Sequence, residues 1–92
     1  MLACPFCGRG YKYVAWLKVH ARARHIVGNR CPVCGEEFLS DDALMKHLAM
    51  KGRRCERHLV VWYLAKESRK RGLRHHEMSR KALELLRRGL RL

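Results

Sequence analysis

The sequence predicts a small α+β fold that is held together by bound metal ions rather than by a large hydrophobic core. A chain of 92 residues buries too little apolar surface to stabilise separate cores by hydrophobic contact alone. Five cysteines and six histidines are available as a second source of stability. Most of them recur in two copies of one pattern that has the spacing of metal ligands, which favours metal sites over disulfides.

The two copies of the pattern align without a gap. The segments CPFCGRGYKYVAWLKVH and CPVCGEEFLSDDALMKH each place two cysteines, an aromatic residue, a leucine and a histidine at the same positions. The cysteines bind one ion from a tight turn, and the glycine after each second cysteine, Gly8 or Gly35, permits the positive φ that such a turn often needs. The aromatic residue and the leucine form a core too small to fold without the metal, so the metal is structural.

This doubled pattern strongly resembles the C2H2 zinc-finger family from Leu2 to His47, about half of the chain. The resemblance implies two ββα C2H2-type fingers, each built around one structural Zn²⁺ ion. In the first finger, the second histidine follows the first within the roughly three to five residues allowed, which completes the site. The predicted metal ligands are Cys4, Cys7, His20 and His25 in the first finger and Cys31, Cys34 and His47 in the second.

The fourth ligand of the second site is missing from its usual place, because positions 51 to 53 are Lys-Gly-Arg. Cys55 is the ligand that we expect, since Gly52 can end the finger helix and thiolate is a strong zinc ligand. The site would then be an atypical one with three cysteines and one histidine. His58 is the alternative ligand, and water in an open fourth position is a third possibility. The sequence has no HExxH motif and no nucleophile triad, so we expect no enzyme.

The residues after the fingers predict a C-terminal α-helical hairpin. One helix should run from near Glu56 to Arg71 and stop at Gly72, and its apolar middle, LVVWYLA, must be covered. A last helix within HEMSRKALELLRRG, capped by Gly89, can supply that cover, and dimerisation through its leucines is the competing account. The predicted domains are finger 1 at residues 1–27, finger 2 at 28–58 and a basic helical extension at 59–92.

The net charge of +13 predicts a polyanionic partner. Residues 53–92 carry 13 basic and 4 acidic side chains, and arginine outnumbers lysine 14 to 7 in the whole chain, which favours bidentate contacts with phosphate. We expect nucleic acid, with structured RNA first, as for the small zinc-bearing proteins of ribosomes, and with a DNA-binding regulator or chromatin-type protein as the alternative. The residues expected to contact nucleic acid are Arg22, Arg24, Arg53, Arg54, Arg57, Arg69, Lys70, Arg71, Arg74, Arg87 and Arg88.

The positions that touch bases in family fingers carry few base-reading side chains in this sequence. They fall on Tyr13, Trp16 and Val19 in the first finger and on Ser40, Ala43 and Lys46 in the second. None is the arginine that reads guanine, nor the asparagine or glutamine that reads adenine. The three positions of the first finger form an apolar strip that is typical of a packing face. A protein-interaction module that uses this strip is therefore a further alternative.

The linker and the N-terminal residues predict how the two fingers are arranged and where the protein is located. The linker IVGNR is shorter than that of fingers which follow the major groove of DNA in series, so we expect the two fingers to pack against each other. The start MLACPFCG has no export signal, which predicts reduced thiols and a cytoplasmic location with nucleoid or ribosome association. The longest apolar run is far shorter than the roughly 20 residues that cross a bilayer, so no membrane partner is expected. We expect a monomer within a larger assembly.

Overall fold

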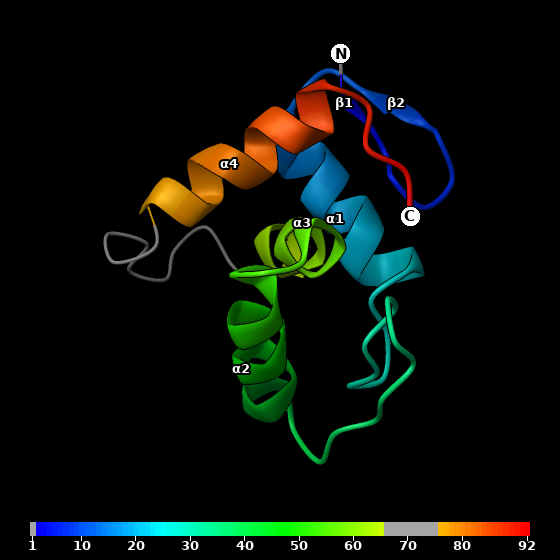
Figure 1. Cartoon of the computed structure of the whole chain (residues 1–92). Helices are drawn as coiled ribbons and strands as arrows, with labels where there is room; N and C mark the ends of the chain where they lie inside the picture. Colours follow the sequence, from blue (N-terminus) through cyan, green and yellow to red (C-terminus); the bar gives the residue numbers. More distant parts are fainter. Residues whose placement is uncertain (1, 66–75) are drawn as a thin grey trace.

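The computed structural model describes residues 2–65 and 76–92. In this part of the chain it has two strands, β1 (Leu2–Ala3) and β2 (Gly10–Tyr11), and four helices, α1 (Val14–Arg24), α2 (Asp41–Gly52), α3 (Glu56–Ala65) and α4 (His76–Arg87) (Figure 1). None of these four helices is long and apolar enough to cross a membrane. The predicted continuation of the third helix to Arg71 and its stop at Gly72 lie outside the described residues.

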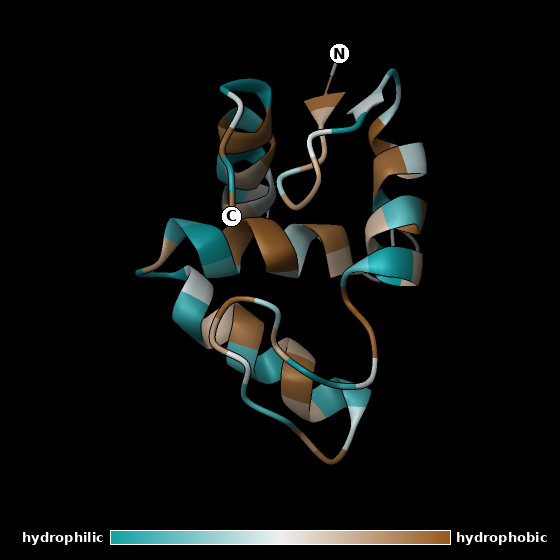
Figure 2. Ribbon diagram, turned by 90° about the vertical axis from the view of Figure 1, so that its right-hand side faces the viewer, coloured by the Kyte–Doolittle hydropathy of each residue, from teal (hydrophilic) through white to brown (hydrophobic). Residues whose placement is uncertain are grey.

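Helix α3 lies in the middle of the molecule and contacts α1, α2 and α4 (Figure 2). Seven consecutive residues of α3, His58–Leu64, are buried. A helix that is buried all round needs neighbours on every side. Helix α4 is one of these neighbours, and its Ala82, Leu85 and Leu86 belong to the same hydrophobic core. The predicted cover of the third helix by the last one is therefore confirmed, and it forms within a single chain.

The first Cys/His unit, residues 2–25, has a two-stranded antiparallel sheet beside a helix. Leu2 pairs with Tyr11 across the sheet, and α1 contacts both strands. The helix turns Leu17 and Ala21 inward, where both are fully buried. Tyr11 packs against the same core. The aromatic and leucine positions of the repeated pattern thus share a core, but this core is not a separate small one, because it also includes residues of α2, α3 and α4.

The second Cys/His unit, residues 30–58, has almost no sheet. Its predicted hairpin is reduced to one bridge between Arg30 and Glu37, whose exposed side chains also form an ion pair with 3.0 Å between Nη2 and Oε1. Helix α2 begins as expected, because the Oγ of Ser40 accepts a hydrogen bond from the backbone N–H of Ala43 at 3.2 Å. With so little strand pairing, this unit depends on its helix and on its metal ligands.

Gly52 has a different role from the predicted one. We expected a glycine C-cap, but Gly52 is the buried last residue of α2, and Arg53 follows it in the right-handed helical region at φ −68°. A Cβ at position 52 would lie 3.0 Å from the Cα of Leu59 on α3. The missing side chain therefore allows the backbones of α2 and α3 to approach each other.

The linker and the C-terminal tail both pack against the rest of the molecule. Of the two apolar linker residues, Ile26 packs against the core whereas Val27 remains 55% exposed. Gly89 has a φ of +85° just beyond α4, where the sequence predicts its C-cap. The tail then returns to the first unit, where the backbone N–H of Leu92 donates a hydrogen bond to the carbonyl of Pro5 at 2.9 Å.

Candidate metal centres

The two cysteine turns have the same backbone conformation. In the first, the N–H of Gly8 donates to the carbonyl of Cys4 at 2.7 Å, and in the second the N–H of Gly35 donates to the carbonyl of Cys31 at 2.8 Å. The two glycines have φ values of +82° and +78°, a region that strains any residue with a Cβ. The predicted need for glycine at both turns is confirmed.

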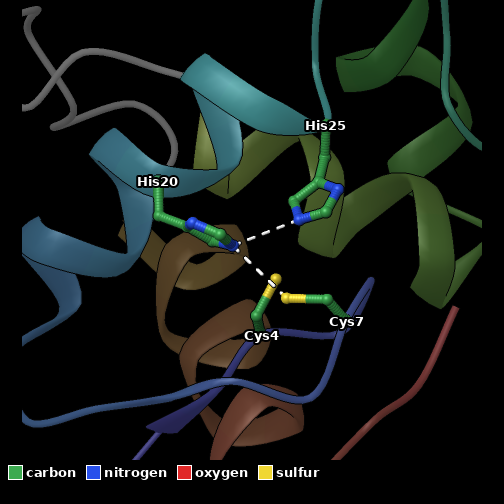
Figure 3. Close-up of side chains that lie close together, drawn as sticks. All are labelled: Cys4, Cys7, His20 and His25. Carbon is green, nitrogen blue, oxygen red and sulfur yellow. Dashed lines mark hydrogen bonds between the residues drawn. The ribbon is translucent and has the colours of Figure 1, made fainter.

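The first site brings together the four residues that the sequence predicts. Figure 3 shows the side chains of Cys4, Cys7, His20 and His25 pointing toward one another. The cysteines come from the turn after β1, His20 comes from α1, and His25 is the residue that ends α1. The Nε2 atom of His20 lies 3.4 Å from the Sγ of Cys7 and 3.1 Å from the Nε2 of His25.

The second site draws its four residues from three separate segments. Cys31 and Cys34 come from the turn, His47 from α2 and His58 from the first turn of α3. Their potential ligand atoms all lie within 4.8 Å of one another. The Sγ of Cys34 is 3.5 Å from the Nε2 of His47, and the two imidazole rings have centroids 5.3 Å apart. This site therefore joins α2 to α3.

These separations fit a tetrahedral zinc ion. With Zn–S distances of about 2.3 Å and Zn–N distances of about 2.0 Å, ligand atoms at the corners of a tetrahedron are about 3.3 to 3.8 Å apart. The measured separations of 3.4, 3.1 and 3.5 Å lie in or close to that range. Each site has four protein ligands, and each could hold one zinc ion as a closed structural site.

The imidazole of His58 independently indicates a metal. This side chain is buried, and neither its Nδ1 nor its Nε2 has a hydrogen-bond partner in the described part of the chain. An unpaired buried polar atom costs about 1 to 3 kcal/mol. A zinc ion on one of the two nitrogens removes much of that cost, so the donor set fits the ion.

Cys55 is not part of the second site, contrary to the prediction from the sequence. Helix α3 begins at Glu56, and Cys55 is fixed in the turn before it: its N–H donates to the carbonyl of Lys51 at 2.8 Å, and its carbonyl accepts from the N–H of Leu59 at 3.0 Å. The first turn of α3 instead carries His58 to the other ligands. The site is therefore Cys2His2 rather than Cys3His, and with two thiolates around Zn²⁺ it is formally neutral, as the first site is.

The aromatic position of the repeated pattern packs against the first histidine ligand in both units. Ring centroids are 5.1 Å apart for Tyr11 and His20, and 4.8 Å apart for Phe38 and His47. In the second unit, the Oε2 of Glu36 lies 3.7 Å from the Nδ1 of His47, whose Nε2 faces the other ligands. This separation is too long for a hydrogen bond, but the nearby negative charge favours a proton on Nδ1, which leaves Nε2 free to bind metal.

Burial, more than any neighbouring charge, moves the pKa values of four of the ligands. It raises the pKa of the Cys4 and Cys31 thiols above the ordinary 9.0, and it lowers the pKa of His25 and His58 below the ordinary 6.5. Neighbouring positive charge, such as that of Arg24 beside His25, lowers the histidine pKa further. At neutral pH the two imidazoles are therefore in the neutral form that binds metal, and the buried thiols release their protons when metal binds.

The basic residues predicted to contact nucleic acid differ in their surroundings. Six of them are exposed: Arg24, Arg53, Arg54, Arg57, Arg87 and Arg88. Arg22 is half-buried, and the exposed Arg88 donates to the Oε1 of Glu84 at 2.7 Å. Four more lie outside the described residues: Arg69, Lys70, Arg71 and Arg74.

The sequence interpretation missed two cations on α4. Arg80 and Lys81 are exposed and line a shallow hollow together with Arg87. The sequence contains a signal for Arg80, because Arg80 is seven residues before Arg87, which is two turns of a helix and places the two side chains on one face.

The apolar strip predicted on the first helix is exposed. Tyr13, Trp16 and Val19 keep 51%, 57% and 58% of their surfaces accessible. The rings of Tyr13 and Trp16 contact each other edge to face, with centroids 4.7 Å apart. The strip therefore does not pack into this molecule's own core.

Comparison with known proteins places the chain among zinc-binding proteins. Residues 1–53 match the family model described as "Drought induced 19 protein (Di19), zinc-binding". The chain is 33% identical over 64 residues to "Zinc finger E-box-binding homeobox 2" of Homo sapiens, and 35% identical over 64 residues to "Zinc finger E-box-binding homeobox 1" of Gallus gallus. These matches cover 66% and 65% of this chain but only 5% and 6% of the relatives' length. No solved structure matches the chain significantly.

Proposed function

Because the chain belongs to the zinc-binding family of the drought induced 19 protein, we propose that it is a module of two C2H2 zinc fingers that binds nucleic acid, with duplex DNA as the ligand. The two zinc ions hold the fold, and arginine side chains contact the phosphate backbone. The two Cys/His units are the two fingers, the second of them with a reduced hairpin.

The observation that carries this proposal is a surplus of unpaired arginine. Of the arginines in residues 2–65 and 76–92, only Arg30 and Arg88 form an ion pair with an acidic side chain of the same residues. On a small chain with a net charge of +13, most of the arginine charge is thus left for an anionic partner. Arginine binds phosphate in a bidentate geometry, and release of counterions from the nucleic acid then favours binding.

Duplex DNA is favoured over RNA by the relatives. Their names state binding to an E-box, which is a DNA element, although the chain spans only a small fraction of their length. Nothing in the structure or the comparisons supports the structured RNA or the ribosomal association expected from the sequence. DNA, the alternative of the sequence interpretation, therefore becomes the proposed ligand.

The contacts that we propose are with the backbone more than with base edges. Tyr13, Trp16 and Val19 offer few hydrogen bonds to a base, and the Oγ of Ser40 is already used to cap α2. Asp41 and Asp42, in the first turn of α2, would repel phosphate at that end of the helix. Binding should therefore depend strongly on salt and weakly on sequence.

A structural rather than a catalytic role for zinc is part of the proposal. Each site has four protein ligands, whereas a catalytic zinc keeps one position open for water or substrate. A non-enzymatic role and an intracellular location stay predictions from the sequence.

Fluorescence anisotropy with two unrelated 20-base-pair duplexes and a folded RNA hairpin tests the function. We expect similar affinity for both duplexes, a steep fall of affinity with salt, and loss of binding when a chelator removes zinc. Absence of duplex binding at low salt by protein that holds two zinc ions would overturn the proposal. Tighter binding of the RNA hairpin at equal salt would restore the RNA preference.

The exposed strip on α1 favours a second candidate function, protein interaction. The first unit has no acidic side chain, and Lys12 lies beside the strip with its Nζ 5.7 Å from the Tyr13 ring centroid. An amphipathic helix with apolar residues flanked by aspartate and glutamate would fit this surface. A displayed peptide library should enrich such sequences, and Trp16→Ala should abolish the enrichment while DNA affinity is kept. Loss of DNA affinity in the same variant would place the strip on the DNA surface instead.

A further inference from the structure

We propose that the outward side of α4 is a second contact surface for nucleic acid, which binds the phosphate backbone of duplex DNA through Arg80, Lys81 and Arg87. The inference rests on the proposed nucleic-acid function. It adds a surface that lies outside both Cys/His units, on an element that the family match at residues 1–53 does not include.

The surface is a shallow hollow along one side of α4. Its volume is about 500 Å³, and three of its lining residues are cations. The lining residues are Arg80, Lys81, Leu83, Glu84 and Arg87. Helix α4 runs along the edge of the molecule in Figure 1.

The three cations have no acidic partner in the described part of the chain. Glu84 is the acidic residue in the hollow, and its Oε1 already accepts a hydrogen bond from Arg88 at 2.7 Å. Glu77 is exposed in the first turn of α4, where the helix dipole favours a negative charge. The positive charge of the hollow is thus left for an external anion.

The spacing of the cations suits a regular array of phosphates. Arg80 and Arg87 are seven residues apart on α4, which corresponds to about 10 Å along the helix axis. Because a DNA strand winds around its axis, neighbouring phosphates are about 7 Å apart and every second phosphate about 12 Å, so the two long arginine side chains can reach phosphates one or two nucleotides apart.

The opposite side of α4 holds these cations in place. Ala82, Leu85 and Leu86 are buried in the core shared with α3. Arg87 also lies near enough to the buried Tyr63 of α3 for its charge to lower that residue's pKa, against a larger increase from burial. Because the packed helix fixes the backbone that carries these cations, only the rotamer freedom of their side chains is lost on binding, which favours a defined contact.

Two double variants with the same net charge test the surface. Arg80→Gln with Arg87→Gln removes two unpaired cations from the hollow, whereas Arg9→Gln with Arg30→Gln removes two exposed cations that lie outside α4 and are not among the residues expected to contact nucleic acid. Affinity for one duplex is measured over a range of salt concentrations. Zinc content and far-ultraviolet circular dichroism check that both variants are folded.

A plot of the log of the association constant against the log of the salt concentration has a negative slope. We expect the magnitude of this slope to decrease by about 1.8 in the Arg80/Arg87 variant, which is about 0.9 for each lost phosphate contact. The slope should change little in the control. Adding Lys81→Gln should lower the slope further. Equal weakening of both variants, or unchanged binding by the Arg80/Arg87 variant, would overturn the inference and leave the proposed function standing. Failure of the unaltered zinc-loaded protein to bind duplex would overturn both. Polyglutamate that competes as well as DNA at equal charge would indicate an acidic protein and overturn the phosphate assignment.

Discussion

The two Cys/His units share one pattern of residues, but they complete their metal sites in different ways. In the first unit, His20 lies on α1 and His25 ends the same helix, so the site closes within one local segment. In the second unit, α2 supplies only His47, and His58 comes from α3. The same pattern thus gives a local metal site in one copy and a cross-link between separate helices in the other.

The units also differ in charge. The first has no acidic side chain, whereas the second has five: Glu36, Glu37, Asp41, Asp42 and Glu56. Two of these are at the N-terminus of α2, where they stabilise the helix through its dipole. The second unit is thus the one that anchors α3, through His58. The first unit, with five basic side chains and no acidic one, has more positive net charge to offer to phosphate than the second, with six basic and five acidic side chains.

The largest expected effect comes from breaking the cross-link. His58→Ala should lose the second zinc ion and destabilise the protein by about 3 kcal/mol or more, because zinc binding supplies folding free energy and α2 would separate from α3. Cys55→Ser should keep both ions and change stability by less than about 1 kcal/mol. Zinc content by a chromogenic chelator and unfolding in urea measure both quantities. Loss of the second ion in the Cys55 variant alone would return the ligand role to Cys55.

Gly52→Ala tests the helix contact that accompanies the cross-link. The added Cβ would lie 3.0 Å from the Cα of Leu59, so α2 and α3 must move apart. We expect a loss of about 1 to 3 kcal/mol in urea unfolding, although alanine normally stabilises a helix relative to glycine. Met50→Ala, in the same helix and at a side chain that is 71% exposed, is the control and should be nearly neutral. A stabilised Gly52 variant would contradict the close approach.

Acidification should release zinc from both units alike, in spite of their different construction. Burial raises the pKa of Cys4 and Cys31 above 9.0, so each site gives up at least one proton when zinc binds near neutral pH. Affinity should therefore fall at least tenfold, or about 1.4 kcal/mol, per unit decrease in pH. Protonation of His25 and His58 should contribute to this fall only below pH 6.5, since the pKa values of these two imidazoles are lowered.

Competition with a chelator of known affinity, repeated at several pH values, measures this dependence. The His58→Ala variant, which is expected to lose the second zinc ion, serves to assign each step of zinc release to one of the two units. Zinc affinity that does not change between pH 7 and pH 9 would contradict the raised thiol pKa values.

The smallest effect is expected at the reduced hairpin of the second unit. Arg30→Ala removes the ion pair with Glu37, whose two side chains are 61% and 72% exposed, and exposed pairs contribute less than about 1 kcal/mol. Urea unfolding at low and at high salt should show that the small difference from the unaltered protein vanishes in salt. A loss above about 2 kcal/mol would mean that this bridge carries more of the fold than its exposure indicates.

Much of the fold could be predicted because local chemistry determines it. The positive φ of Gly8 and Gly35, the Ser40 cap and the burial of Leu17 each follow from interactions within a few residues or within one unit. The first metal site could be predicted for the same reason, since its ligands lie in one turn and one helix.

The fourth ligand of the second site could not be predicted in this way. The spacing along the chain favours Cys55, which is nearer to His47. The position of α3 decides the outcome, because its first turn carries His58 to the other ligands. The role of Gly52 was hidden for a related reason, because a close approach between two helices leaves no local signature. Charge composition predicts an anionic partner, but it does not say which face of α4 carries Arg80 and Arg87.

The two tryptophans are separate fluorescent reporters, one in the buried helix α3 and one on the surface of the first unit. Trp62 on α3 is only 4% exposed, whereas Trp16 on α1 is 57% exposed. A buried indole emits at shorter wavelength than one in water, so the two emission bands should be distinguishable. Trp16→Phe leaves one emitter in the helix that the second zinc site anchors, and Trp62→Phe leaves one on the surface of the first unit. Unfolding and ligand binding can thus be followed separately without any added dye.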